Sequence, residues 1–402
     1  MGSLIPHHGQ TPGTAFFLPA GPTKGIMTRT IGVLGGGQLA RMMIPAAITL
    51  GIDLRVLAES GGMSASLAAT RVGDYRDLDT VLAFAEGVDA ITFDHEHVPQ
   101  HVLRALVDAG VSVQPGPDAL RFAQDKLLMR ERLTELGVPV PEWAPVRSAA
   151  ELGAFLAANG GSAVVKTPRG GYDGKGVRVV RDEHDADDWF EALPDGESAL
   201  LAEELVDFRR ELAQSVARRP SGDIVAWPVV ESIQRDGVCA EVIAPAPGAA
   251  LKVSGVASDI AYAVAEGVGV TGVLAVELFE TQDDRLLVNE LAMRPHNTGH
   301  WSIDGSTTSQ FEQHLRAVLD LPLGATGCRE PWSVMVNVLG GPARGGLDDR
   351  YPLVFEDQPA VKVHNYGKDP RPGRKVGHVT AVGPDLDEVA YQARAAAAFF
   401  QD

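Results

Sequence analysis

The sequence predicts a protein of mixed α/β and α+β class, and three observations carry the prediction. Short apolar strands alternate with helical segments from Thr30 to Val113, which is typical of an open α/β sheet. A loop with four glycines, Thr167–Gly176, joins two short apolar strands. Two further apolar runs, Val273–Phe279 and Leu286–Leu291, flank a polar segment. Polar or glycine-rich loops between neighbouring apolar runs indicate antiparallel hairpins.

The composition is that of a globular protein with two or three domains. Its 402 residues leave ample length for hydrophobic cores, and 45% hydrophobic with 22% charged residues is ordinary. The net charge of −18 argues against a general nucleic-acid binder, and an anionic substrate would need a local concentration of Lys and Arg. Cys239 and Cys328 lie far apart and form no metal or disulfide motif, which favours a reducing cytoplasmic location.

No targeting or membrane segment is recognisable. The sequence has no apolar run of about 18 residues, so we expect no membrane span. The segment Met1–Thr28 is rich in Gly, Pro, Thr and His, and its apolar piece is too short and too broken by proline for a signal peptide. We therefore expect residues 1–28 to form a disordered extension.

The first strand–turn–helix unit resembles a nucleotide-binding element. The strand Thr30–Leu34 is followed by the turn Gly35–Ala40, a helix to about Leu50, a strand at Asp53–Leu57 and then Glu59. A G-x-G-x-x-A turn with an acid about 20 residues on fits the dinucleotide fingerprint and would suggest an NAD-dependent enzyme. The helix N-terminus can hold the phosphate of other nucleotides equally well, so the ligand stays open.

A second polar segment follows the strand Ala90–Phe93. Ligands bind outside the carboxyl ends of strands in open α/β sheets, so Glu96 is placed to bind a ribose hydroxyl. A capping role before the helix that begins near Pro99 is equally compatible with the local sequence. The strand expected next is Val111–Val113.

The glycine-rich loop predicts a mobile flap over phosphates. It lies between the strands Ala163–Lys166 and Val177–Val180 and lacks the spacing and the following helix of a Walker P-loop. Glycine amides can close over phosphates, and Lys166 at a strand end is a suitable phosphate partner. The alternative is a loose hairpin with incidental charges. Lys126, at the start of the helix Asp125–Leu136, is by itself equally compatible with plain surface.

The later hairpin predicts a pair of facing carboxylates. A two-residue turn at Asp283-Asp284 would set Glu277 opposite Glu290, where like charges repel. Solvent exposure of the glutamates is the alternative. Because Arg294, His296 and neighbouring polar residues follow closely, we favour a site in which Mg²⁺ lies between the carboxylates and an anion.

The C-terminal part predicts short strands, at Ser333–Leu339, Ala360–His364 and Val376–Ala381, and a final helix, Asp385–Phe399. The loop Lys368–Lys375 gathers four basic residues in an acidic protein. It supplies the local cationic spot that an anionic substrate needs.

Five motifs in order give the chain a specific resemblance. They are GVLGGGQLARM (32–42), TFDHEHVP (92–99), VVKTPRGGYDGKG (164–176), VNELAMRPHNTGHW (288–301) and RPGRKVGH (371–378). Together they resemble the ATP-grasp enzymes and, within them, the 5-(carboxyamino)imidazole ribonucleotide synthetases of purine biosynthesis. The resemblance implies a Rossmann-like domain at 29–124, an ATP-grasp domain at 125–325 whose glycine-rich β-hairpin flap belongs to a subdomain at about 125–202, and a small β-rich domain at 326–402.

The resemblance also implies the roles of individual residues. Metal ligands would be Glu277 and Glu290. ATP would be bound by Lys126, Lys166, Gly171, Asp173, Gly174, Lys175, Gly176, Glu203, Glu204, Leu205, Val206, Glu211, Asn289 and Glu290. Aminoimidazole ribonucleotide would be bound by Gly37, Gln38, Leu39, Glu96, Tyr172, Asp173, Lys175, Lys368, Arg374 and Lys375. Bicarbonate or its carboxyphosphate would be handled by Arg294, His296, Asn297 and Lys375.

The implied reaction is the ATP- and bicarbonate-dependent carboxylation of the exocyclic amine of 5-aminoimidazole ribonucleotide. It would use one or two Mg²⁺ with ATP and no biotin, in a cytoplasmic homodimer without nucleic-acid or membrane partners. Charge stabilisation and exclusion of water suffice for such chemistry, so no nucleophilic side chain is needed. Departures from the family pattern are Ala40 for Gly, Val177 for Gln, and Ala292 where the wider superfamily has Asn, for which Asn289-Glu290 would compensate.

Three alternatives compete with this interpretation. Another ATP-grasp ligase or carboxylase, such as biotin carboxylase or a formate-dependent purine transformylase, would share the flap and the carboxylate pair. An NAD-dependent dehydrogenase would explain only the turn Gly35–Ala40 and Glu59. A non-catalytic nucleotide-binding module would leave the carboxylate pair without a purpose.

Overall fold

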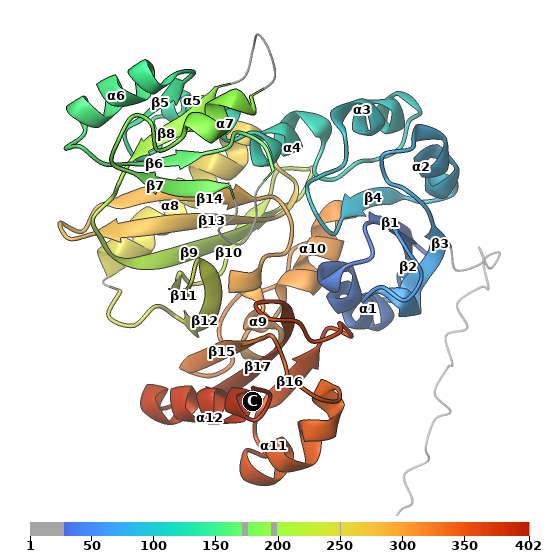
Figure 1. Ribbon diagram of the computed structural model, residues 1–402. Coiled ribbons are helices and arrows are strands. Elements are labelled where there is room, and N and C mark those ends of the chain that lie inside the picture. The colour runs from blue at the N-terminus through green and yellow to red at the C-terminus, as the bar shows by residue number, and fades with distance from the viewer. Residues whose placement is uncertain (1–27, 171–175, 194–198, 250, 402) are drawn as a thin grey trace, which may run out of the picture.

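The computed structural model describes residues 28–170, 176–193, 199–249 and 251–401. In these residues the chain forms three sheets with helices packed against them (Figure 1). Because 171–175 and 1–27 lie outside the described residues, the flap tip and nearly all of the expected extension stay predictions.

The N-terminal part is a parallel sheet in the order β3-β2-β1-β4. Its strands are β1 (Thr30–Leu34), β2 (Asp53–Ala58), β3 (Ala69–Val72) and β4 (Ala90–Phe93). Its helical segments are α1 (Gln38–Leu50), η1 (Ser66–Ala68), α2 (Leu78–Ala85), α3 (Gln100–Asp108) and α4 (Pro117–Gln124). The prediction of a strand at Val111–Val113 was wrong. Only Val113 forms a bridge, to Ile91, in which Ile91 N–H donates to the Ser112 carbonyl and Gln114 N–H to the Ile91 carbonyl, and the chain then bends at Gln114-Pro115.

A small antiparallel sheet in the order β5-β8-β6-β7 carries the predicted flap. Helix α5 (Lys126–Glu135) precedes it, and the Asp125 side chain caps that helix by accepting from Leu127 and Leu128 N–H. The other elements are β5 (Trp143–Val146), α6 (Ala149–Ala158), β6 (Ala163–Lys166), β7 (Val177–Val180), α7 (Asp187–Glu191) and β8 (Leu200–Glu204). Strands β6 and β7 pair antiparallel, as the hairpin prediction requires.

The large sheet has nine strands and runs from the central part into the C-terminal part. Its order is β14-β13-β9-β11-β12-β15-β17-β16, with β10 paired to β9. The strands are β9 (Phe208–Arg218), β10 (Ile224–Ala226), β11 (Val230–Arg235), β12 (Val238–Ala244), β13 (Gly272–Thr281), β14 (Leu286–Ala292), β15 (Trp332–Leu339), β16 (Lys362–Asn365) and β17 (Lys375–Gly383). Because β12 pairs with β15, the C-terminal β-structure continues the central sheet.

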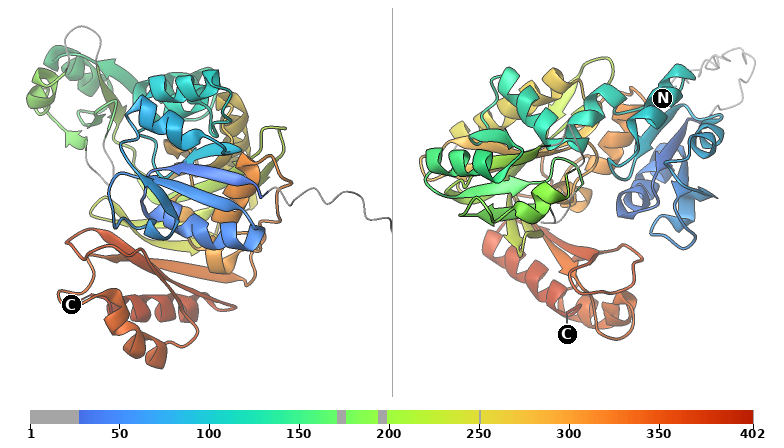
Figure 2. Two further views of the ribbon diagram at one scale, coloured as in Figure 1. Left: turned by 90° about the vertical axis from the view of Figure 1, so that its right-hand side faces the viewer. Right: turned by 45° about the horizontal axis from the view of Figure 1, so that its top comes forward.

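Helical segments cover the large sheet and link it to the N-terminal part. They are α8 (Leu251–Val268), η2 (Asn297–Gly299), α9 (Ser302–Gly305), α10 (Gln310–Val318), η3 (Leu347–Arg350), α11 (Tyr351–Asp357) and α12 (Leu386–Ala398). Figure 2 shows the C-terminal part, with α11 and α12, on one side of the molecule and the flap sheet on another. Within the described ranges, no helix is long and apolar enough to cross a membrane.

Helix α10 fixes the N-terminal sheet against the large sheet. Its residues Phe311 and Leu315 share a core with α1 and β1. The buried His314 bridges the two sheets, because its Nε2 lies 2.8 Å from Thr92 Oγ1 on β4 and its Nδ1 accepts from Val273 N–H on β13 at 3.1 Å. The two sheets therefore hold a defined separation, and the candidate site lies between them.

The β13–β14 hairpin confirms the predicted facing pair but not the predicted turn. Glu277 pairs with Glu290, whereas the register shifts immediately afterwards, so that Leu278 pairs with Val288. The loop is longer than two residues, since Thr281 N–H donates to the Arg285 carbonyl. The bulge offsets the longer loop and leaves both carboxylates on the same face.

Candidate active site

A cavity of about 1840 Å³ lies between the N-terminal sheet, the flap sheet and the large sheet. It is lined by every described residue assigned to a site from the sequence except Gly176, which lies at the flap base with its carbonyl accepting from Thr167 N–H. The predicted residues Gly171, Tyr172, Asp173, Gly174 and Lys175 lie outside the described residues. The cavity thus gathers segments separated by more than two hundred positions along the chain.

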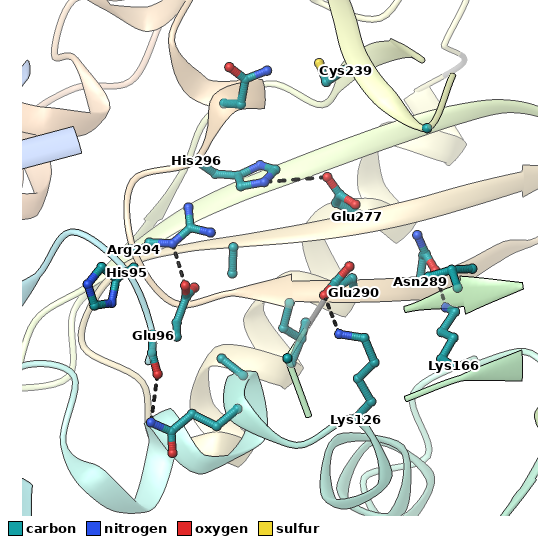
Figure 3. A pocket seen from close by; sticks show the side chains of 18 of the residues that line it. His95, Glu96, Lys126, Lys166, Cys239, Glu277, Asn289, Glu290, Arg294 and His296 are labelled. Carbon is teal, nitrogen blue, oxygen red and sulfur yellow. Dashed lines mark hydrogen bonds and ion pairs between the residues drawn. The ribbon is translucent and has the colours of Figure 1, made fainter. Parts of the chain in front are cut away.

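The facing glutamates line this cavity (Figure 3), where the Glu277 side chain is 22% exposed and the Glu290 side chain 47%. Burial, the charge of Glu290 and that of Glu211 raise the pKa of Glu277 to about 8. Burial also opposes ionisation of Glu290, but the Lys126 ammonium, 3.0 Å from Glu290 Oε1, outweighs it and holds the pKa of Glu290 below its usual range. One carboxylate is thus compensated by a lysine, whereas its partner, Glu277, lies near the neutral His296.

The donor set fits a magnesium ion that arrives with a nucleotide. In the described part of the chain, no group of three or more His, Cys, Asp or Glu side chains could hold a metal by itself. Mg²⁺ in phosphate sites typically takes one or two carboxylates and completes its shell with substrate phosphates and water. Glu277 and Glu290 offer that number of ligands.

A buried ionic cluster holds Lys166 at the wall of the cavity. Lys166 Nζ lies 2.6 Å from Glu203 Oε2 and donates to Asn289 Oδ1 at 3.0 Å. Arg130, which is fully buried, donates to the other oxygen of Glu203 and to the Asn289 carbonyl. Although burial opposes ionisation of Glu203, these two cations lower its pKa. The carboxylate of Glu203 is therefore engaged by cations, which its assignment to ATP binding did not foresee.

The strip after β8 offers an apolar surface beside the cavity. Leu205 and Phe208 are exposed by 43% and 39%, and the Phe208 ring stacks on Phe279 at 4.6 Å. Glu204 and Val206 line the same wall. Exposed apolar side chains at a cavity edge suit a flat heterocycle. Glu211 lies beside them, half-buried, and burial raises its pKa.

Two carboxylates bind the backbone of the glycine turn, and the sequence analysis had predicted neither hydrogen bond. Asp94 Oδ1 accepts from Ala40 N–H at 2.8 Å and so caps α1. Glu59 Oε2 accepts from Gly36 N–H at 2.9 Å. A Cβ on Gly37 would lie 2.0 Å from Asp94 Oδ2, which explains the glycine there. Gly37, Gln38 and Leu39 remain in the cavity wall, where Lys368 Nζ donates to Gln38 Oε1 at 2.7 Å.

This arrangement weakens the dehydrogenase alternative. In a dinucleotide site, the pyrophosphate takes the helix N-terminus and the acid after the second strand binds ribose. Here Asp94 caps the helix, and Glu59 binds the Gly36 amide and His95. Although burial favours its neutral form, these hydrogen bonds lower the pKa of Glu59 to about 2, so the carboxylate stays ionised in that role.

Glu96 connects the N-terminal sheet to the loop after β14. Its Oε2 lies 2.5 Å from Arg294 Nε, and its Oε1 accepts from Met293 N–H at 3.2 Å. The alternative role as a helix cap was wrong, since α3 has no side-chain cap and begins after Pro99. Glu96 thus orients Arg294 in the cavity (Figure 3).

The loop directs a neutral imidazole and an amide into the same space. His296 Nε2 lies 3.7 Å from Glu277 Oε1, and burial, Arg294 and Lys375 hold the pKa of His296 well below its usual value. Asn297 is 7% exposed, and its amide contacts the Cys239 thiol, a weak hydrogen-bonding group; neither Oδ1 nor Nδ2 has a nitrogen or oxygen partner among the described residues. Buried amides normally have partners, so Asn297 is suited to binding a small polar ligand.

The C-terminal loop contributes to the wall of the cavity. Lys368, Arg374 and Lys375 all line the cavity, as the charge argument requires. Arg374 also donates to the Asp369 carbonyl at 3.1 Å, which folds the loop on itself. The site therefore has a cationic wall for an anion, an acidic pair for a metal and an apolar strip for a base.

Several known proteins are similar to this chain in sequence. N5-carboxyaminoimidazole ribonucleotide synthase of Mycobacterium tuberculosis (strain H37Rv) is 52% identical over 372 residues, which cover 91% of this chain and 86% of the relative. The chain belongs to the N5-carboxyaminoimidazole ribonucleotide synthase family. The enzyme of the same name from Corynebacterium ammoniagenes is 50% identical over 380 residues, covering 92% of this chain and 91% of that relative.

Family models and solved structures agree with the synthase assignment. Residues 27–124 match a ribonucleotide synthetase preATP-grasp domain, 131–311 an ATP-grasp domain and 333–392 a phosphoribosylaminoimidazole carboxylase C-terminal domain. The synthetase from Thermus thermophilus superposes with a TM-score of 0.82 at 36% identity over 92% of this chain and 99% of its own. The Aspergillus clavatus synthase, solved with ADP and 5-aminoimidazole ribonucleotide, gives 0.83 at 30% identity over 92% and 98%.

Proposed function

We infer that the protein is an ATP-dependent ligase that carboxylates the exocyclic amine of 5-aminoimidazole ribonucleotide with bicarbonate. The observation that carries this is the Glu277–Glu290 pair, which shares one cavity with the glycine turn and the cationic C-terminal loop. A nucleoside triphosphate can thus be bound on one side of the loop Arg294–His300 and a second, anionic nucleotide on the other. The family relationship identifies the acceptor as aminoimidazole ribonucleotide.

The reaction can be written with all atoms balanced. A bicarbonate oxygen attacks the γ-phosphorus of ATP, the bond to the β-phosphate oxygen breaks, and ADP and carboxyphosphate form. The exocyclic amine then attacks the carboxyl carbon, or CO₂ released from carboxyphosphate, inorganic phosphate leaves, and the amine gives up a proton. Carboxyphosphate is destroyed by water, so a closed cavity protects it.

The residues of the cavity fall into groups that would bind ATP, bicarbonate and the ribonucleotide. Lys166 and Lys126 would bind ATP phosphates, with the strip 204–206 against adenine and Glu211 on ribose. Arg294, His296 and Asn297 would hold bicarbonate, with His296 as a neutral hydrogen-bonding group because its pKa is lowered. Gln38, Leu39 and the basic residues of the C-terminal loop would bind the ribonucleotide.

Glu277 and Glu290 would hold the Mg²⁺ that accompanies ATP. When bound, the ion neutralises phosphate charge and aligns the triphosphate. The raised pKa of Glu277 supports this assignment, since burial beside a second carboxylate leaves it in need of a cation. A second Mg²⁺, a homodimer, a cytoplasmic location and the domain limits given above stay predictions from the family resemblance.

The decisive experiment measures ADP release with ATP, Mg²⁺ and bicarbonate, with and without aminoimidazole ribonucleotide. We expect ADP formation that depends on both bicarbonate and the ribonucleotide. Glu290→Gln should lower the rate about a hundredfold or more, because it removes a metal ligand worth several kcal/mol. Glu266→Gln, on the exposed face of α8, is the control.

The outcomes separate the parts of the proposal. ADP formation only with another acceptor would keep the fold and remove the substrate assignment. Full activity in Glu290→Gln would remove the metal assignment. Binding of NAD(H) without ATP turnover would favour the dehydrogenase alternative.

A further inference from the structure

We propose that Gln310, a buried residue outside the cavity, is a positioning residue that holds the bicarbonate-binding segment His296–His300 in place. The proposal rests on the function inferred above, because it concerns how His296 and Asn297 are aimed. Gln310 is 1% exposed and does not line the cavity, so it reaches the reacting groups only through the backbone that it binds.

One side-chain amide binds this segment at three points. Gln310 Oε1 accepts from His296 N–H at 2.8 Å, and Gln310 Nε2 donates to the His296 carbonyl at 2.8 Å. The same Nε2 lies 2.8 Å from His300 Nδ1. Because an amide nitrogen only donates, His300 Nδ1 must accept, which fixes the tautomer of that ring. The amide thus binds both polar groups of the His296 backbone and the far end of the segment.

Ser302, which follows the segment, adds two hydrogen bonds to this clamp. Ser302 Oγ accepts from Gln310 N–H at 2.9 Å and donates to the Gly299 carbonyl at 2.6 Å. A Cβ on Gly299 would lie 2.4 Å from Gln310 Oε1, so only glycine lets the turn approach so closely. The segment 296–302 therefore wraps around Gln310, and its shape follows from the position of that side chain.

The hydrogen bonds continue from the clamp into the cavity. Thr298 N–H and Oγ1 lie 3.5 and 2.9 Å from His296 Nδ1. The backbone N–H can only donate, so Nδ1 accepts, and the proton of the neutral imidazole lies on Nε2, which faces Glu277. Asn297, whose amide has no nitrogen or oxygen partner among the described residues, is the next residue along the chain. A shift of the His296 backbone would therefore displace two of the three groups that are proposed to bind bicarbonate.

Helix α10, which carries Gln310, is fixed by packing in a hydrophobic core. Gln310 is the first residue of α10, and Phe311 and Leu315 of that helix lie in the core shared with α1. The position of Gln310 is thus set by packing that is independent of any ligand. Such support from outside the cavity is what keeps a binding group within a fraction of an ångström of its working position.

Gln310→Met tests the proposal, and Gln313→Met is its matched control. Gln313 lies one turn along the same helix, is fully buried, and also clamps a backbone, with two bonds of 2.7 Å to the Gly324 carbonyl and N–H. Both variants should lose comparable thermal stability. The kinetic readouts are the KM values for bicarbonate, ATP and aminoimidazole ribonucleotide, and ADP released per ¹⁴C-bicarbonate carbon incorporated.

We expect Gln310→Met to lower kcat/KM for bicarbonate about ten- to a hundredfold, since misplacement by about 1 Å can cost that much. Its KM for ATP should stay within about twofold of wild type, and more than one ADP should be released per carbon incorporated. Gln313→Met should keep wild-type values for all of these. Gly299→Ala, which crowds the clamp from the other side, should reproduce the kinetic pattern of Gln310→Met and replaces it if that variant does not fold.

Two results would overturn the proposal. One is equal kinetics in Gln310→Met and Gln313→Met, and the other is a change in KM for ATP as large as that for bicarbonate. A wild-type protein that shows no bicarbonate-dependent ADP release would instead refute the proposed function. The two failures are therefore distinguishable in the same assay.

Discussion

Replacing Arg130 by Met tests the buried ionic cluster most directly. The Arg130 side chain is fully buried, and Glu203, its partner, is 2% exposed. Removing one member of a buried pair costs about 3–5 kcal/mol, because the remaining charge loses its compensation in a medium of low dielectric constant. Glu203 would keep Lys166 at 2.6 Å, so we expect the lower end, about 3 kcal/mol.

Two companion variants calibrate this value. Glu203→Met would leave Arg130 and Lys166 as two buried cations without a carboxylate, so it should be more destabilising than Arg130→Met. Arg132→Met lies on the same helix but removes hydrogen bonds to the Gly267 carbonyl from a side chain that is 34% exposed. It should cost about 1 kcal/mol.

The assay is urea unfolding at 25 °C followed by tryptophan fluorescence. Trp143 is a suitable reporter, because its indole N–H donates to Thr134 Oγ1 on the helix that carries Arg130. The expected order of loss in unfolding free energy is Glu203→Met, then Arg130→Met, then Arg132→Met. The reasoning is refuted if Arg130→Met unfolds within about 1 kcal/mol of wild type, or no earlier than Arg132→Met.

Two further predictions concern pH and the glycine turn. Burial lowers the pKa of His314 from 6.5 to about 3, so the folded chain binds fewer protons than the unfolded chain between these pH values. The contribution of neutral His314 to the free energy of unfolding is therefore complete above pH 6.5 and declines as the pH falls below it. Between pH 7.5 and 5, the loss of unfolding free energy in urea should therefore be about 2 kcal/mol larger in wild type than in His314→Gln, and an unchanged pH dependence in that variant would contradict the assignment. Gly37→Ala should lower the free energy of unfolding by about 1–3 kcal/mol and raise KM for the ribonucleotide, because the new Cβ would collide with Asp94. The control is Gly61→Ala, whose Cβ would meet no atom within 4 Å, and it should change neither measurement.

The sequence was a good guide to elements whose pattern is local. The first strand and the helix after it, the flap strands and the final helix lie where periodicity and glycines placed them. The Glu277–Glu290 pair was also predictable, because side chains alternate with period two along a hairpin. The two-residue turn was wrong, since a bulge after Glu277 is not encoded by any short pattern.

Residues that act through distant partners left little signal in the sequence. Arg130 is buried on α5 together with the apolar Met129 and Leu133, and an arginine at that position could have indicated a buried ion pair, but not which carboxylate it meets. Asp94 was seen as part of a motif, whereas its bond to Ala40 N–H spans 54 positions. Gln310 had no signal at all, because its partners belong to a turn that has no regular period.

The sequence by itself therefore determined the family, the order of the elements and most of the groups that line the cavity. The tertiary structure alone decided how those groups are held: Glu203 by two cations, Glu96 by Arg294, and the glycine turn by Asp94 and Glu59. The physical reason is one of range. Backbone periodicity and capping depend on neighbours within a few residues, whereas the partner of a buried charge or amide is set by how whole sheets and helices pack.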